Sequence, residues 1–199
     1  MTNIFHMLDP MIIIKTLGLI GVLIIVFAES GLFFGFFFPG DSLLFTAGLL
    51  ASQHLINIET LVIGAFVCAV LGDSVGYWFG KKVGPKIFTK EDSIFFHKKH
   101  IERAQNFYNE YGNKTIFLAR FVPIVRTFAP IVAGVGQMKY RNFLTYNIIG
   151  GFVWAFGMTL GGYFLGEAIP NIDKYILPII LLIVLLSIMP IIIEGFKKR

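Results

Sequence analysis

Four charged residues stand within or beside strongly apolar stretches of the chain and could do chemistry there. Glu29 and Asp41 flank one aromatic-rich run, and Arg120 and Arg126 lie in another apolar segment. Charges among apolar residues cost free energy, so they are candidates for function. Arginine offers a planar fork of N–H donors that suits a phosphate, and a carboxylate can take up or release a proton. Together these residues predict a binding site for an anionic phosphate with proton exchange.

A structural interpretation of the same charges stays open. Glu29 or Asp41 could pair with an arginine and simply hold two segments together. Asp73 is a secondary candidate in a later apolar run, where it could be paired structurally or solvated at a helix end. Substitution of the arginines would separate the functional interpretation from the structural one.

The composition places these residues in a membrane protein. Hydrophobic residues make up 56% of the 199-residue chain and charged residues only 15%, and the mean hydropathy is +0.75. A soluble domain of this length does not need so much apolar surface. About four to six membrane segments fit, since each needs roughly 20 apolar residues. We therefore expect residues 1–199 to form a single, all-α, polytopic membrane domain.

The first apolar segments suggest a hairpin followed by a spanning helix. The run Met11–Phe38 is too long for one upright helix, so we expect it to break. Pro39 and Gly40 then form a turn signal, and the next apolar run is too short to cross a bilayer. A full span, rich in glycine, follows over Ile58–Gly80. We interpret residues 11–80 as a first repeat with a re-entrant hairpin whose tip lies at Pro39 and Gly40.

Residues 81–114 are the long polar stretch of the chain. They carry eight Lys or Arg against four Asp or Glu, which predicts a cytoplasmic loop by the positive-inside rule. Apolar residues at helical spacing, with a capping box at Thr89 and Asp92 and with Gly112 at the end, predict an amphipathic helix on the membrane surface.

The basic residues also determine the rest of the topology. The chain ends in Lys197, Lys198 and Arg199, so we expect both termini to be cytoplasmic. A spanning helix in 142–166 and a C-terminal transmembrane helix in 175–195 then leave Thr115–Met138 to enter and leave on one side. Pro123 and Pro130 should prevent a continuous helix there. We interpret residues 115–166 as a second repeat with its re-entrant tip at Pro123.

An internal repeat supports this interpretation. Several small and aromatic residues recur at an offset of 86 residues, among them Ala47-Gly48 with Ala133-Gly134 and Gly76-Tyr77 with Gly162-Tyr163. Two such halves entering from opposite sides would form inverted repeats, as in many secondary transporters. The glycines of the spans, Gly72, Gly76, Gly80, Gly162 and Gly166, are expected to pack helices closely.

Several other chemistries are not favoured by the residues. The one cysteine, Cys68, allows neither an intramolecular disulfide nor a thiolate metal cluster. His97 and His100 lack a third ligand, so we expect no metal and no other cofactor. The glycine series lacks the Lys-Ser/Thr ending of a phosphate-binding loop. The net charge of +5 suits anionic lipid, because the basic residues gather at membrane borders, and this disfavours nucleic acid.

The motifs together resemble one family. They are Glu29, Phe-Pro-Gly-Asp at 38–41, Ala-Gly at 47–48, Gly-Asp-x-x-Gly-Tyr at 72–77, Arg-Phe-x-Pro-x-x-Arg at 120–126 and Ala-Gly at 133–134. This pattern, from about Glu29 to Gly166, resembles the DedA family, the bacterial branch of the VTT-domain proteins. Many relatives carry a second Pro and a Glu near the first hairpin tip, whereas this chain has Gly40 and Asp41.

The resemblance implies a lipid transporter or scramblase of the cytoplasmic membrane. Its cargo would be undecaprenyl phosphate or, as the alternative, phosphatidylethanolamine and other phospholipids. It also implies that Arg120 and Arg126 bind lipid phosphate and that Glu29 and Asp41 couple to protons. Competing classes are a structural membrane protein and a lipid phosphatase. We expect no enzyme, because Ser42 and Thr127 lack a recognisable base, and a homo-oligomer stays open.

Overall fold

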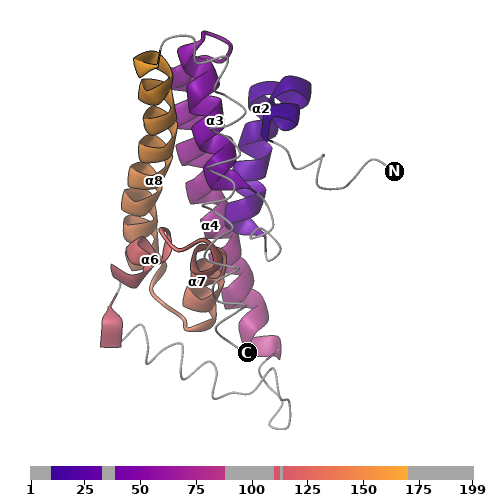
Figure 1. Cartoon of the computed structure of the whole chain (residues 1–199). Helices are drawn as coiled ribbons and strands as arrows, with labels where there is room; N and C mark the ends of the chain where they lie inside the picture. The colour runs from indigo at the N-terminus through magenta and orange to yellow at the C-terminus, as the bar shows by residue number, and fades with distance from the viewer. Residues whose placement is uncertain (1–9, 33–38, 88–109, 113, 170–199) are drawn as a thin grey trace, which may run out of the picture. The chain divides into compact units, whose positions relative to one another are not determined.

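The structure, a computed structural model, describes residues 10–32, 39–87, 110–112 and 114–169 of the chain. Figure 1 shows that its regular elements in these ranges are helices. They are α2 (Pro10–Gly31), α3 (Gly40–Ser52), α4 (Ile58–Ile87), α6 (Lys114–Ala119), α7 (Pro123–Val135) and α8 (Tyr140–Ala168). The predicted all-α class is therefore confirmed for the described part of the chain.

Two of the described helices, α4 and α8, are long and apolar enough to cross a membrane. The qualifying stretches are Ile58–Val83, with 26 residues, and Tyr140–Ala168, with 29. At about 1.5 Å per residue, each exceeds a hydrocarbon layer of ~30 Å. In the most apolar part of Ile58–Val83 only 39% is buried inside the protein, and in that of Tyr140–Ala168 only 33%. Most of this apolar surface therefore faces outward.

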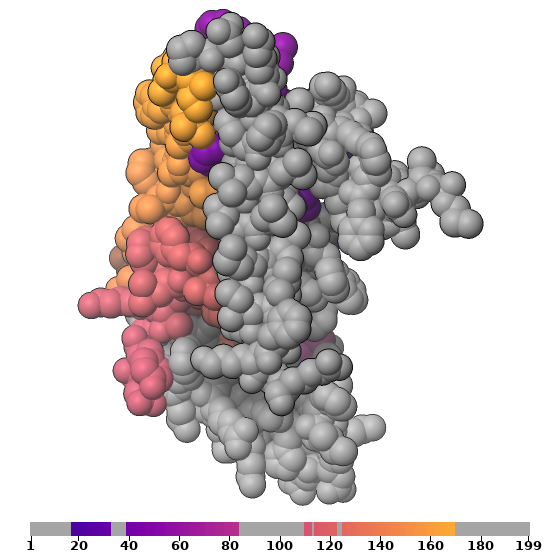
Figure 2. All heavy atoms as spheres, in the orientation of Figure 1, coloured from indigo at the N-terminus to yellow at the C-terminus, as the bar shows by residue number. Residues whose placement is uncertain are grey.

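The outward surface of α4 is a stripe of large apolar side chains. Val67, Leu71 and Val75 follow one another every four residues and are 43%, 53% and 46% exposed. On α8 the exposed apolar residues are Ile148, Ile149, Phe152, Val153 and Phe164, and Figure 2 shows this helix, in orange, on the visible surface. Such continuous apolar stripes are costly in water and suit a lipid environment.

The first apolar run is interrupted, as its length predicts. Within α2 the backbone leaves helical geometry at Gly18, where φ is 59° and ψ is −154°, values that glycine adopts most easily. The helix ends at Gly31. Helix α3 starts at Gly40, directly after Pro39, and has only 13 residues, so it is too short to span a bilayer.

The segment Thr115–Met138 forms two short helices, α6 and α7, joined by a turn at residues 120–122. Pro123 takes the first position of α7, where its missing N–H is not needed. Pro130, however, lies inside α7, so the expectation that it breaks the helix is wrong. It only removes the N–H that would bond the carbonyl of Arg126. We therefore assign the break between α6 and α7 to Pro123, at the start of α7.

The described helices form two compact units. The first contains residues 39–63 and 156–169 with the beginning of α2, and the second contains the end of α2, residues 64–87 and residues 114–155. Each unit thus combines pieces of both predicted repeats.

The core of the second unit is built around Tyr77 of α4. Its ring stacks on Phe143 of α8 with 4.7 Å between the ring centroids. Its hydroxyl donates a hydrogen bond to the backbone carbonyl of Met138, and Ile116 and Ala133 complete the buried cluster. These contacts fix the short helices α6 and α7 against the two long helices.

Two predictions lie mainly outside the described residues. They are the amphipathic helix within residues 81–114 and the C-terminal transmembrane helix in 175–195. At the described end of the first segment, residues 110 and 111 are helical. Gly112 follows with a φ of 72°, a left-handed value that suits a helix end.

Candidate functional site

Two buried ion pairs lie in the second unit. Arg120, in the turn between α6 and α7, pairs with Asp73 of α4, and Arg126 of α7 pairs with Glu29 of α2. In each pair the arginine side chain is 3% exposed and the carboxylate side chain 4%. Among the side chains whose exposure the structure describes, no other charged group is buried. The opposite charges make this burial tolerable.

A hydrogen-bond network fixes Arg120. Its Nη2 donates to Asp73 and also to Oδ1 of Asn147, 3.1 Å away. Asn147, on α8, donates from Nδ2 to the backbone carbonyl of Val70 at 3.1 Å. The small size of Gly151 is required here, because a Cβ at that position would lie 2.9 Å from Nη1 of Arg120. The turn between α6 and α7 is therefore tied to both long helices.

The indole ring of Trp154, on α8, contacts both arginines. The Cζ atoms of Arg126 and Arg120 lie 4.7 Å and 5.8 Å from the ring centroid, within the range of a cation–π contact. Trp154 is only 5% exposed, so water screens these contacts little.

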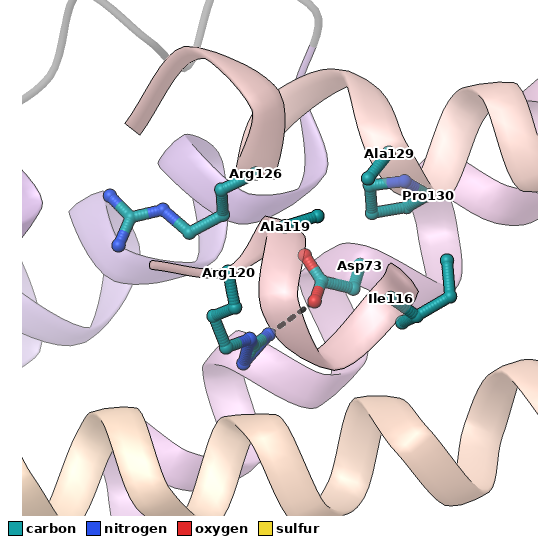
Figure 3. A pocket seen from close by; sticks show the side chains of 7 residues that line it. All are labelled: Asp73, Ile116, Ala119, Arg120, Arg126, Ala129 and Pro130. Carbon is teal, nitrogen blue, oxygen red and sulfur yellow. Dashed lines mark hydrogen bonds and ion pairs between the residues drawn. The ribbon is translucent and has the colours of Figure 1, made fainter. Parts of the chain in front are cut away.

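A small cavity adjoins the Arg120–Asp73 pair. Its volume is about 10 Å³, close to that needed for one water molecule. It is lined by Asp73, Ile116, Ala119, Arg120, Arg126, Ala129 and Pro130. Figure 3 shows Arg120 and Asp73 turned toward each other, while the guanidinium of Arg126 extends away from them. A phosphate group does not fit, so an anion can reach the arginines only if a carboxylate gives way.

Two polar atoms of this cavity are left over. Oδ1 of Asp73 and Nη1 of Arg120 are buried and have no hydrogen-bond partner within the described ranges. An unsatisfied buried polar atom costs roughly 1–3 kcal/mol. The ion pair therefore does not satisfy all of its hydrogen-bonding groups. Oδ1 of Asp73 can accept one more hydrogen bond, and Nη1 of Arg120 can donate one.

The remaining predicted residues of the first hairpin belong to the other unit. Pro39 and Gly40 lie at the N-terminus of α3, and Asp41 stands half-buried in its first turn, where a carboxylate suits the positive end of the helix dipole. Of the predicted charges, the structure pairs Glu29 with Arg126. It gives Arg120 a partner in Asp73, which the sequence suggested only as a secondary residue.

The five glycines expected to pack helices are all buried. They are Gly72, Gly76, Gly80, Gly162 and Gly166. At Gly72 a Cβ would lie 2.6 Å from the backbone carbonyl oxygen of Phe27, so this glycine lets α4 approach the part of α2 that carries Glu29. At Gly76 a Cβ would meet only ordinary contacts, the nearest at 3.5 Å.

Two residues of the site were not singled out by sequence reasoning. Asn147 and Trp154 stand seven positions apart in the apolar run of α8, with Gly151 between them. Spacings of four and three place these three residues on one helix face. A polar amide in an apolar span, in line with a glycine and a tryptophan, was the signal that could have found them.

The described part of the chain is all-helical, and it has two apolar helices of spanning length and charges buried between helices, as an integral membrane protein does. The VTT domain family matches residues 38–164. The chain is similar to Protein DedA of Escherichia coli, with 44% identity over 178 residues, 88% of this chain and 81% of that protein. The chain therefore belongs to the DedA family of VTT-domain membrane proteins.

Mycobacterial relatives agree with this membership. An uncharacterized membrane protein of Mycobacterium tuberculosis is 45% identical over 198 residues, which cover 96% of this chain and 86% of the relative. One from Mycobacterium leprae is 43% identical over 201 residues, with 96% and 90% covered. No solved structure matches the chain significantly.

Proposed function

We propose that this protein transports a phosphate-bearing lipid across the bacterial cytoplasmic membrane, as a flippase or scramblase, with undecaprenyl phosphate as the first candidate cargo. The observation that carries the proposal is the pair of buried arginines, Arg120 and Arg126, within a protein of membrane helices. Guanidinium groups bind phosphate through paired, charge-assisted hydrogen bonds. Burial strengthens such bonds, because water does not compete for the donors.

The carboxylates supply the exchange that transport requires. Glu29 and Asp73 occupy arginine donors in the described structure. An arriving phosphate competes for those donors, and a carboxylate that loses its arginine in an apolar setting takes up a proton instead. When the phosphate leaves, the carboxylate releases the proton and pairs again. Asp41, half-buried at the start of α3, is a further carboxylate proposed for proton coupling beside Glu29 and Asp73.

The proposal includes two inverted repeats in the membrane. The hairpin with its tip at Pro39 enters from outside, and the hairpin with its tip at Pro123 enters from the cytoplasm. The short lengths of α3 and α7, 13 residues each, support re-entrant segments over spanning ones. Residues 81–114 and both termini are then cytoplasmic, by the distribution of Lys and Arg.

Cysteine accessibility tests this topology. After removal of Cys68, single cysteines at the exposed positions Lys114 and Lys139 should react with an impermeant thiol reagent from the same side of the membrane. Single cysteines at His100 and Lys198 should both be shielded from reagent added outside. Labelling of the cysteines at positions 114 and 139 from opposite sides would mean that residues 115–138 cross the bilayer, and would contradict the inverted repeat.

Reconstitution in liposomes separates the proposed function from its competitors. Movement of a lipid phosphate without its release identifies a transporter, and release of inorganic phosphate identifies a lipid phosphatase. If neither lipid movement nor phosphate release is observed, the interpretation as a structural membrane protein remains. Equal movement of phosphatidylethanolamine and undecaprenyl phosphate would replace the specific flippase by a general phospholipid scramblase.

Variants of Arg126 test the role of the guanidinium. Lysine keeps the charge and loses the planar fork, so Arg126→Lys should slow transport about tenfold, and Arg126→Ala should slow it further. The rate of lipid movement is the measurement, made on protein with wild-type helix content. Wild-type rates of lipid movement in both variants would mean that Arg126 does not bind the lipid phosphate.

A further inference from the structure

Trp154 places one aromatic surface against both cations of the site. The guanidinium carbons lie 4.7 Å and 5.8 Å from its ring centroid, although Arg126 comes from α7 and Arg120 from the preceding turn. Two buried like charges repel each other, so their approach to one ring needs a compensating attraction. The ring draws both guanidinium groups toward the same face of α8.

The contacts of each guanidinium are of two kinds. N–H groups donate hydrogen bonds from Arg120 to Asp73 and Asn147 and from Arg126 to Glu29. The contact with Trp154 is a cation–π contact, which depends on the electrostatic attraction between the cation and the electron-rich ring and needs no hydrogen-bond donor. An incoming oxyanion competes for the N–H donors. The contact with Trp154 can therefore persist when a carboxylate is replaced.

We propose that Trp154 is a positioning residue that holds Arg120 and Arg126 in place while their N–H donors pass from the carboxylates to a lipid phosphate. This inference rests on the proposed function, because it assigns the anion that takes the donors. Trp154 does not itself contact the phosphate in this scheme. Its removal weakens the anion site by loosening the arginines.

Substitutions at Trp154 separate positioning from simple filling of space. Trp154→Phe keeps an aromatic ring with a weaker cation–π contact, and Trp154→Leu keeps apolar bulk without a ring. We expect the lipid concentration for half-maximal binding to rise about threefold for phenylalanine and about tenfold or more for leucine. The free energy of unfolding of both variants is measured beside these affinities. A residue that only fills space would lower the stability and leave the lipid affinity of the folded protein unchanged.

The intrinsic fluorescence of Trp154 gives a readout that stability alone does not move. The chain has two tryptophans, and Trp78 is 49% exposed and outside the site. In the Trp78→Phe background all tryptophan emission comes from Trp154. The protein is reconstituted in phosphatidylcholine vesicles with increasing phosphatidic acid, whose phosphate monoester serves as the probe.

The expected result is a saturable change of Trp154 emission with phosphatidic acid and no change in phosphatidylcholine alone. In Arg126→Lys the response should need more phosphatidic acid. The matched control keeps Trp78 and carries Trp154→Phe, and its emission should not respond. The positioning role is overturned if Trp154 emission is unaffected by phosphatidic acid, or if Trp154→Leu binds the lipid with wild-type affinity.

Lipid movement, measured in the same vesicles, keeps the two proposals apart. One outcome is that lipid moves, but Trp154 emission does not change and Trp154→Leu binds lipid as the wild type does. This outcome overturns the role of Trp154 and is consistent with the transport function. A saturable emission change without movement of phosphatidic acid, or of undecaprenyl phosphate added to the same vesicles, supports Trp154 at an anion site and overturns transport.

Discussion

The helix pairs α3–α8 and α7–α4 use glycine in the same way, and the comparison between them explains the buried charges. A Cβ at Gly162 of α8 would collide with the backbone carbonyl of Phe45 in α3. A Cβ at Gly80 of α4 would collide with that of Ile131 in α7. Phe45 and Ile131 are equivalent positions of the 86-residue repeat, whereas Gly162 corresponds to Gly76 and lies one helical turn before the equivalent of Gly80. Both units therefore contain a close glycine–carbonyl contact, made by glycines one turn apart.

Buried charge, in contrast, is found in one unit only among the side chains that the structure describes. Glu29, Asp73, Arg120 and Arg126 all belong to the second unit. At the repeat position of Asp73, the first unit has the fully buried Thr159. Glycine contacts of this kind therefore form without an ion pair. The desolvation cost of two pairs in the second unit then points to function over stapling.

The largest expected effect breaks one ion pair on one side. Asp73→Leu leaves Arg120 buried without its counter-charge, and the free energy of unfolding in detergent should fall by about 3–5 kcal/mol. The matched change in the first unit is Thr159→Val, which removes a hydroxyl that has no hydrogen-bond partner within the described residues. It should change the same free energy by less than about 1 kcal/mol. Equal losses of unfolding free energy in Asp73→Leu and Thr159→Val would contradict the difference in buried charge between the two units.

A second substitution should repair that loss. In Asp73→Leu/Arg120→Met neither charge remains, and an apolar pair of similar volume often packs as well as a buried ion pair. We expect the free energy of unfolding to return to within about 1 kcal/mol of the wild type. A double variant as unstable as Asp73→Leu alone would mean that the pair is needed for packing.

The next effect in size tests whether the two glycine contacts are alike. Gly80→Ala and Gly162→Ala each force a methyl group against a backbone carbonyl, and each should lower the free energy of unfolding by about 1–3 kcal/mol. At Gly157 a Cβ would have no atom within 4 Å, so Gly157→Ala should raise it slightly, by up to about 1 kcal/mol. A loss confined to one unit would contradict a shared mode of packing.

Asn147→Ala should have a smaller effect. It removes one hydrogen bond to Arg120 and one to the carbonyl of Val70, so the free energy of unfolding should fall by about 1 kcal/mol. Transport should suffer more than stability, because Arg120 loses an orienting partner. A transport rate that follows stability alone would make Asn147 a packing residue.

The smallest effect at any single pH is expected for Asp41→Asn. This change removes the carboxylate from the first turn of α3 and keeps the size of the side chain, so lipid binding should stay measurable. The dependence of the transport rate on pH should become flatter. Rates measured across a pH series, with Ser42→Ala as a neighbouring control, check this. An unchanged pH profile would remove Asp41 from proton coupling.

Much of the fold could be predicted from the sequence. The spans of α4 and α8 followed from apolar length, and the short α3 and α7 from Pro39 and Pro123, because these signals act locally. Pro130 misled the expectation, since a helix tolerates a proline when tertiary contacts hold it in place. The membership of the DedA family also followed from motifs that are continuous in the chain.

The site could be predicted only as a set of candidates. Glu29, Arg120 and Arg126 were identified because charge is conspicuous in apolar surroundings. Their pairing depends on which helices meet. Asp73 and Arg120 are far apart in the chain, so no local sequence signal predicts their contact. Trp154 was missed for a related reason, because an aromatic residue in a membrane helix is unremarkable until two arginines lie over its ring.

The most direct test of the account is lipid movement by the Asp73→Leu/Arg120→Met variant in liposomes. The variant should fold with nearly wild-type stability, so a change in transport would report on the charges and not on packing. The account predicts that movement of undecaprenyl phosphate or phosphatidic acid falls at least about tenfold, because half of the guanidinium site is gone. Movement at the wild-type rate would show that the Arg120–Asp73 pair is a staple and would contradict the central claim.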